Sequence, residues 1–143
     1  MRSTYNKFLF IGEERSKTAI ERGWTWEDGR LAAKQLFDCL LAIDIEVEPE
    51  TCKFMNWFEE DYPRRKVIGI ARQGYVPVAM GAKVHKAMTE AELFHLHIVH
   101  PAARGTIRKK ENYTKHLKEK LINENKEWEN PPICDRQTSN VVL

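Results

Sequence analysis

The sequence predicts an α/β fold with three layers, α/β/α, in which helices cover both faces of a mostly parallel four-stranded sheet. The apolar run at residues 8–11 is continuous rather than alternating, which is typical of a strand buried on both faces. Along the rest of the chain, runs of strand length alternate with segments whose apolar residues recur at helical spacing. This alternation is typical of βαβ units and therefore of a parallel sheet.

The first predicted helix follows a loop that contains two tryptophans. Asp28 is its expected N-cap. Apolar residues then recur at i, i+3, i+4, i+7 and i+8 over residues 33–41, which predicts an amphipathic helix. Pro49 interrupts the pattern, and a second strand is expected over residues 52–58, with Asn56 near its end.

Proline and glycine set the limits of the next elements. Pro63 is expected to open a short helix that Gly74 closes. A third strand is expected over residues 76–80, where Gly81 ends it. Helical spacing of apolar residues then predicts a helix over residues 82–91.

The last strand is expected over residues 93–99. Pro101 stops it, because proline cannot continue a central ladder. A final, heavily charged helix is indicated by one stripe of apolar residues, formed by Tyr113, Leu117 and Leu121.

The chain length of 143 residues indicates one domain with a hydrophobic core. We expect this domain to cover residues 1–129. Residues 130–143 contain two adjacent prolines and many polar residues, so we expect a loosely ordered tail there.

Composition excludes some classes of protein. The three cysteines are odd in number and lack a Cys-x-x-Cys spacing, which argues against a zinc knuckle and a disulfide framework. No apolar run is long enough to span a membrane and the N-terminus has no signal-peptide pattern, so we expect a cytoplasmic protein without a membrane partner. The net charge of +2 is not informative, but lysine and arginine outnumber acids over residues 104–120.

Residues suited to chemistry follow the predicted strands. Right-handed crossovers place the carboxyl ends of parallel strands at one edge of the sheet, where ligands bind in open α/β folds. The residues expected to meet there are Glu13, Glu14, Asn56, Gly81 and His100. Two carboxylates, an amide and a histidine form a set for acid–base chemistry and recognition. The alternative for the two glutamates is a solvated, charged loop after a strand.

Several enzyme classes lack their motif in this chain. There is no Gly-x-Ser-x-Gly elbow of a serine hydrolase and no Gly-x-x-x-x-Gly-Lys phosphate loop. A dinucleotide fold is also excluded, because no Gly-x-Gly-x-x-Gly follows the first strand.

The order of the remaining motifs resembles the uracil-DNA glycosylase superfamily, over residues 7–120. Ile-Gly-Glu at residues 11–13 is similar to the start of the family's water-activating motif. An asparagine in a strand and a Met-Gly pair at residues 80–81 follow. Val-His-Pro-Ala at residues 99–102 is similar to the family's late His-Pro-Ser motif.

The resemblance implies a monofunctional DNA glycosylase that hydrolyses the N-glycosidic bond of a flipped-out uracil or other damaged or modified base, as in base-excision repair. It implies that Glu13 or Glu14 activates water, and Glu13 is the closer match. His100 would donate a hydrogen bond to the base oxygen on which negative charge collects. For His100 the alternative is a capped histidine at a strand end.

The resemblance also implies residues that bind the base. Gly12 would let the base come close. Trp26 would stack on the extruded base, with Trp24 as its rival, and Asn56 would read the polar edge of the base. The alternative role of Asn56 is to satisfy a strand end.

The implied partner is damaged or modified DNA, duplex or single-stranded, bound by a monomer without metal or other cofactor. The loop after the His-Pro pair would probe the duplex, and basic residues would contact phosphates. The implied DNA-binding residues are Gly81, Ala102, Ala103, Arg104, Arg108, Lys109 and Lys110. For the basic residues the alternative is a solvated helix end.

The chain departs from the family pattern at several positions. Arg15-Ser16 stands where Pro-Gly is usual, and Ala102 replaces the serine after His-Pro. The chain is short, and the iron–sulfur cysteines of some branches are missing. Two other functions therefore stay open: a non-catalytic DNA-binding module with the glycosylase fold, and a hydrolase of free nucleosides or nucleotides.

Overall fold

The computed structural model describes residues 7–123, which form one parallel sheet with helices on both faces. The strand order is β2-β1-β3-β4, and each neighbouring pair is parallel. The α/β prediction is confirmed, and the sheet is parallel throughout rather than mostly parallel. The strands are β1 (Phe8–Gly12), β2 (Cys52–Asn56), β3 (Val76–Met80) and β4 (Leu96–Ile98). The predicted tail at residues 130–143 lies outside the described residues.

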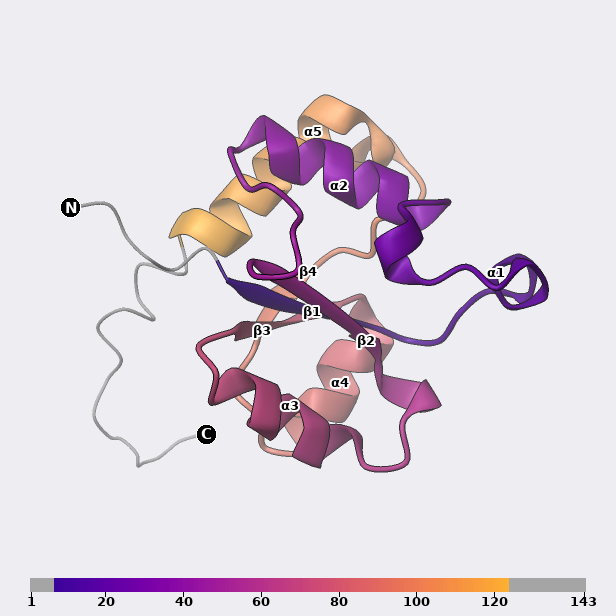
Figure 1. Cartoon of the computed structure of the whole chain (residues 1–143). Helices are drawn as coiled ribbons and strands as arrows, with labels where there is room; N and C mark the ends of the chain where they lie inside the picture. Colours follow the sequence, from indigo (N-terminus) through magenta and orange to yellow (C-terminus); the bar gives the residue numbers. More distant parts are fainter. Residues whose placement is uncertain (1–6, 124–143) are drawn as a thin grey trace.

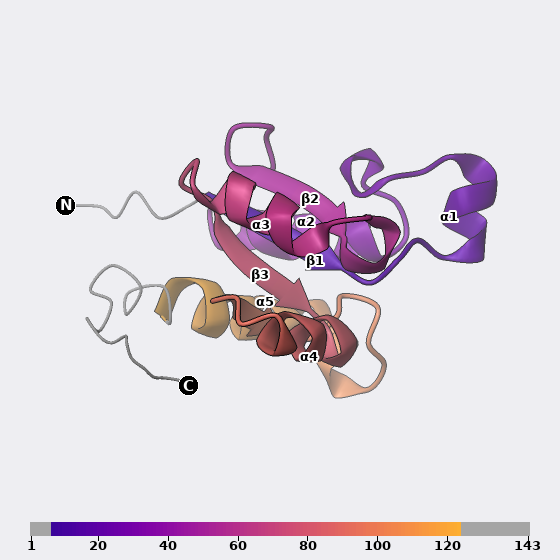
Figure 2. The same cartoon turned by 90° about the horizontal axis from the view of Figure 1, so that it is seen from below.

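Two helices cover each face of the sheet (Figure 1). One face carries α2 (Ala32–Ala42) and α5 (Lys110–Leu117), and the other carries α3 (Pro63–Ala71) and α4 (Ala82–Glu90). A fifth helix, α1 (Lys17–Arg22), projects from the body of the molecule beyond the carboxyl end of β1 (Figure 2). Shorter helical turns are η1 (Trp26–Asp28), η2 (Trp57–Glu59), η3 (Thr106–Arg108) and the π-helical η4 (Lys118–Asn123).

Strand β1 is buried along its whole length and divides the hydrophobic core in two. Phe8 and Phe10 pack in the cluster beneath α2 and α5. Leu9 and Ile11 point to the opposite face and pack in the cluster over α3 and α4. Because both faces are covered, every position of the strand is apolar, as the continuous run predicts.

Two strands are shorter than predicted. β2 ends at Asn56, because the backbone turns there into η2 instead of continuing to residue 58. β4 begins at Leu96 rather than at residue 93. The Leu93 N–H donates to the Met88 carbonyl at 3.0 Å, so this segment closes α4 before the strand begins.

The segment between β1 and α2 also differs from the prediction. Helix α1 is not among the predicted elements; Ser16 caps it, and Gly23 ends it in the left-handed region with φ 72°. Asp28 does not cap α2, because its carboxylate accepts the Thr25 N–H at 2.7 Å within η1. Leu31 occupies the N-cap position of α2 instead.

One limit of a predicted helix is corrected as well. Helix α3 begins at Pro63, as predicted, but it ends at Ala71, before Gly74. Gly74 adopts φ 101° in the turn that leads into β3, so it serves that turn rather than the helix end.

Three histidines form a cluster where α4 packs against β4. The His95 Nδ1 atom lies 2.8 Å from the Leu93 carbonyl oxygen, so His95 Nδ1–H donates there and its Nε2 accepts from His85 Nδ1–H at 2.9 Å. The His85 and His97 rings stack in parallel, with centroids 4.1 Å apart. Burial lowers the pKa of His95 and of His97, and for both the nearby His85 lowers it further.

We expect acidification from pH 7 to pH 5 to lower the free energy of unfolding through this cluster. An unfolded histidine takes up a proton at about pH 6.5, whereas the pKa values of His95 and His97 are lowered in the folded protein. As pH falls below about 6.5, the unfolded state therefore binds more protons than the folded state, and stability is lost. The groups whose charge lowers the pKa of His97 are all basic: His85, His95, Lys120 and His116. Urea unfolding at pH 7, 6 and 5 should show a smaller loss for His97→Gln than for the wild type; equal losses would contradict the prediction.

Candidate functional site

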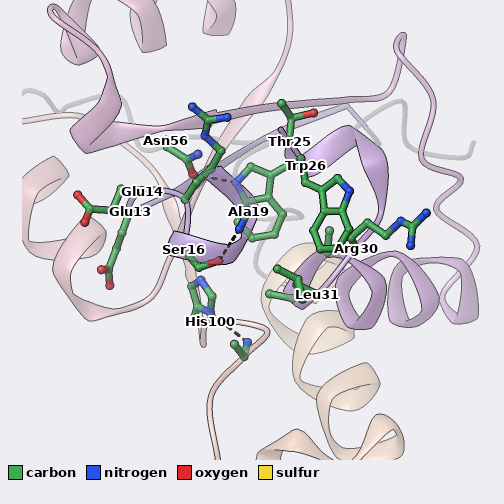
Figure 3. A pocket seen from close by; sticks show the side chains of 15 residues that line it. Glu13, Glu14, Ser16, Ala19, Thr25, Trp26, Arg30, Leu31, Asn56 and His100 are labelled. Atoms are coloured by element: carbon green, nitrogen blue, oxygen red, sulfur yellow. Dashed lines mark hydrogen bonds between the residues drawn. The ribbon is translucent and has the colours of Figure 1, made fainter. Parts of the chain in front are cut away.

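A pocket of about 420 Å³ opens at the carboxyl edge of the sheet (Figure 3). Its walls come from the loop after β1, from α1, from residues 24–33 and from the turn after β4. The volume lies in the range of small-molecule sites, about 300–1,000 Å³. The lining is mainly apolar, with a few polar groups among the apolar side chains, as in a site that orients a small ligand.

Most of the predicted catalytic and base-binding residues meet in this pocket. Those that line it are Glu13, Glu14, Trp26, Asn56 and His100, and Ala102, which was predicted to contact DNA, lines it as well. Gly12 lies behind the Trp26 and Asn56 side chains, and Gly81 lies beside Glu13 and His100. The predicted residues that do not line it are Ala103, Arg104, Arg108, Lys109 and Lys110.

The Asn56 side chain is a buried amide, with 8% of its surface exposed. One of its amide atoms lies 2.8 Å from Trp26 Nε1. An indole N–H can only donate, so this atom is the oxygen and the amide orientation follows. No described residue accepts a hydrogen bond from its Nδ2 group, and an unsatisfied buried donor costs about 1–3 kcal/mol. The pocket therefore offers a buried donor to an acceptor on a ligand.

Gly12 makes this arrangement possible because it has no side chain. A Cβ atom at this position would lie 2.7 Å from Asn56 Oδ1 and 2.9 Å from Trp26 Cζ2. Both distances are shorter than a carbon atom tolerates. The glycine at the end of β1 thus lets Trp26 reach Asn56 at the end of β2.

His100 follows β4 and lines the pocket. The Ala102 N–H donates to His100 Nδ1 at 3.0 Å, so in the neutral ring the proton is on Nε2. Burial lowers the pKa of His100, and the Glu13 carboxylate opposes this shift only in part. At neutral pH, His100 is therefore an uncharged donor through Nε2–H.

The two glutamates occupy different positions. Glu13 is about one-third exposed, and its Oε1 lies 4.0 Å from Lys83 Nζ. Its Oε2 and the His100 Cβ flank Gly81, at 3.9 and 3.5 Å from the place of a Cβ atom there. Glu14 is exposed. Glu13 is thus the glutamate whose charge acts on His100.

The two tryptophans also differ. The Trp24 ring has the guanidinium carbons of Arg22 and Arg30 at 5.3 and 5.2 Å from its centroid. Trp26 instead stacks on Phe54, with centroids 6.2 Å apart and planes 14° apart. Trp26 is therefore backed by the core and held by Asn56, whereas Trp24 is engaged by two cations.

Sequence reasoning placed no function on Arg15 and Ser16, although both line the pocket. The Arg15 N–H donates to the Glu59 carboxylate at 2.5 Å, and its guanidinium pairs with the same carboxylate at 3.4 Å. Ser16 Oγ accepts the Ala19 N–H at 3.2 Å and so begins α1. A serine cap followed by Gly23 is a recognisable sequence signature of this helix. These residues fasten the loop that carries the two glutamates.

The turn after His100 joins the pocket to a second one of about 430 Å³. Leu31, Ala32 and Ala102 line both pockets, and Arg108 lines only the second. Of the predicted basic residues, Arg104, Arg108, Lys109 and Lys110 are all exposed.

Searches against protein-family models, curated proteins and solved structures found no match to this chain. Within residues 7–123, no group of three histidine, cysteine, aspartate or glutamate side chains is arranged to hold a metal ion. None of the helices in this part of the chain combines the length and the apolar character needed to cross a membrane.

We expect Gly12→Ala to disrupt the Trp26–Asn56 pair, because the added methyl group overlaps both side chains. The free energy of unfolding should fall by about 1–3 kcal/mol, and the tryptophan emission spectrum should shift. Gly69→Ala is the matched control, since nothing lies within 4 Å of the added atom in α3. It should stabilise the protein by about 0.5–1 kcal/mol. Unchanged stability and emission in Gly12→Ala would show that the close approach is unimportant.

Proposed function

We propose that this protein is a monofunctional DNA glycosylase that hydrolyses the N-glycosidic bond of an extruded uracil or other damaged or modified base. The observation that carries the proposal is the buried Asn56 amide, whose Nδ2 donor has no acceptor among the described residues. The neutral His100 ring lines the same pocket, as do the Trp26 ring and the Glu13 carboxylate. A pyrimidine offers carbonyl oxygens to both donors and a flat face to the indole.

The geometry suits the charges that develop in this reaction. As the C1′–N bond breaks, positive charge grows on the sugar and negative charge on the base. His100 Nε2–H would donate to the base oxygen, and donors held in a water-poor site stabilise such charge strongly. The neutral His100 ring can serve as this donor, because its Nε2 already carries a proton. The departing base is the anion that accepts the hydrogen bond.

Glu13 would act on the sugar side. Its carboxylate would stabilise the positive sugar and accept one proton from the attacking water, whose oxygen bonds to C1′. The electron pair of the broken bond leaves with the base, which takes up a proton on release. Glu13 is favoured over Glu14 because its carboxylate acts on His100, while Glu14 is exposed.

The test is a screen of oligonucleotides that each carry a single uracil, hydroxymethyluracil, hypoxanthine or other modified base. Base release leaves an abasic site that alkali cleaves, so a gel detects the product. Cleavage of at least one substrate is expected. Release from free nucleosides alone would identify a nucleoside hydrolase, and DNA binding without release from any lesion would identify a binding module.

His100→Ala should slow base release by about a hundred- to a thousand-fold, the usual effect of removing one preorganised donor. Glu13→Gln should also slow it strongly, because the amide keeps the shape and loses the basicity. Glu14→Gln should cost less than Glu13→Gln. Single-turnover kinetics, with DNA affinity and unfolding measured in parallel, separate chemistry from folding. A larger loss in Glu14→Gln than in Glu13→Gln would exchange the two roles.

Arg108 and Lys109 are proposed to bind phosphates. Replacing both with alanine should weaken DNA binding for all sequences and lower the slope of log affinity against log salt by about one for each phosphate that is no longer neutralised. Lys86→Ala is the control, because Lys86 is an exposed lysine of α4 whose ion-pair partner within residues 7–123 is Glu90 of its own helix. If the double variant and the control bind equally, the two basic residues belong to a solvated surface.

A further inference from the structure

Two arginines contact one tryptophan ring at the edge of the pocket. The Arg22 guanidinium carbon lies 5.3 Å from the centroid of the Trp24 ring, and the Arg30 guanidinium carbon lies 5.2 Å from it. Trp24 and Arg30 line the pocket. A flat, weakly hydrated guanidinium is attracted to the face of an indole ring, so Trp24 holds both side chains near it. These three residues are called the Trp24 cluster below.

Two glycines in the left-handed region bring the Trp24 cluster together. Gly23 has φ 72° and ends α1, so the chain reverses directly after Arg22. The Trp24 N–H then donates to a carbonyl of α1 at 2.8 Å, which fixes the tryptophan against the end of the helix. Gly29 has φ 67° and ends η1 just before Arg30. The backbone therefore brings cations from both sides of Trp24 in the sequence to the same ring.

The two guanidiniums have no carboxylate partner within residues 7–123. No ion pair or hydrogen bond joins Arg22 or Arg30 to an acid in this part of the chain. Arg15, which lines the same pocket, differs because it pairs with Glu59. Arg22 and Arg30 are also exposed, so their N–H donors are open to a ligand. Two positive charges held at one ring without a counter-charge favour the binding of an anion.

The two ends of the pocket carry opposite charges. Figure 3 shows Glu13 and Glu14 at one end and Arg30 at the other, with the Trp26 ring between them. The carboxylates repel an anionic group of a ligand, and the Trp24 cluster attracts it. The anionic group of a ligand in this pocket is therefore expected at the end formed by the Trp24 cluster.

We propose that the Trp24 cluster binds a phosphate monoester, which is either the phosphate of a free nucleotide or the terminal phosphate of a nucleic-acid strand. A phosphate monoester carries a charge of about −1.5 to −2 at pH 7, which two guanidiniums balance. Each guanidinium presents forked N–H donors that match two phosphate oxygens. This anion site goes beyond the proposed reaction and does not require it. Only the joining of the phosphate to a base in the pocket rests on the proposed function.

The first test is a titration with inorganic phosphate at constant ionic strength, followed by NMR of the tryptophan indole N–H groups. The signal of Trp24, identified by its loss in Trp24→Phe, should shift and saturate. Arg22→Gln and Arg30→Gln should each weaken phosphate binding at least about tenfold, because each removes a charge-assisted hydrogen bond. The absence of a saturable shift, or wild-type affinity in both variants, would overturn the proposal.

Arg65→Gln is the matched control for these variants. The Arg65 guanidinium carbon also lies over an aromatic ring, 5.2 Å from the centroid of Tyr62, but neither residue lines the pocket. Its phosphate affinity should equal that of the wild type. An equal loss in Arg65→Gln and Arg30→Gln would show a general effect of surface charge and would contradict the anion site.

Two further comparisons identify the source of the phosphate. One compares deoxyuridine with its 5′-phosphate, and the other compares oligonucleotides with and without a 5′-phosphate, with uracil at the first, second or third position. All probes carry a 2′-fluoro group at the uridine, which disfavours the positive sugar and so permits binding to be measured without hydrolysis. In at least one comparison the phosphate should raise affinity about tenfold, and Arg30→Gln should remove the gain. A gain with the nucleotide assigns a free nucleotide, and a gain with the strand alone assigns a strand end. No gain in either comparison would contradict the proposal.

These outcomes distinguish the anion site from the enzyme. If the wild type releases a base and Arg30→Gln binds phosphate as the wild type does, the anion site is wrong and the glycosylase stands. If the wild type releases no base from any lesion but binds phosphate through Arg22 and Arg30, the anion site stands and the glycosylase is wrong.

Discussion

The hydrogen bond between Trp26 and Asn56 depends on the pairing of two strands and on one missing side chain. The register of β1 with β2 sets Gly12 beside Asn56. Because Gly12 has no Cβ atom, the Trp26 indole passes over the strand end and reaches the Asn56 oxygen at 2.8 Å. One bond therefore joins the end of β1, the end of β2 and the segment before α2. It also turns the amide so that its amino group remains for a ligand.

The other half of the site depends on the order of the strands. β3 and β4 lie beyond β1, so the residues that follow them, Gly81 and His100, come next to Glu13. Gly81 adopts φ 100° and leaves the space in which the Glu13 and His100 side chains approach each other. A donor and a carboxylate are thus held by three adjacent strand ends. Glu13 follows β1 directly and His100 comes shortly after β4, so the positions of both side chains are set by the strand ends.

The sequence was sufficient for the parallel sheet and for most of the predicted residues that line the candidate pocket, because continuous apolar runs and the residues that stop them are local features. The spacing of apolar residues did not predict helix α1, because its one buried residue is Ala19. The early start predicted for β4 counted Leu93 as a strand residue, whereas it closes α4. Ring and amide orientations at His100 and Asn56 depend on contacts from distant segments, so no local pattern could reveal them.

The unfavourable backbone conformation of Leu31, at the edge of the pocket, is tolerated because the helix that follows it is held by the hydrophobic core. Helix α2 buries Leu36, Cys39 and Leu40 completely against the sheet and α5, so its position is set by core packing rather than by its first residue. The capping side chain that most helices use can therefore be given up at residue 31, and an unfavourable backbone conformation can persist there. The rest of the pocket is built in the same way. The buried sheet and its helices fix the strand ends, and the residues that follow the strands line the pocket.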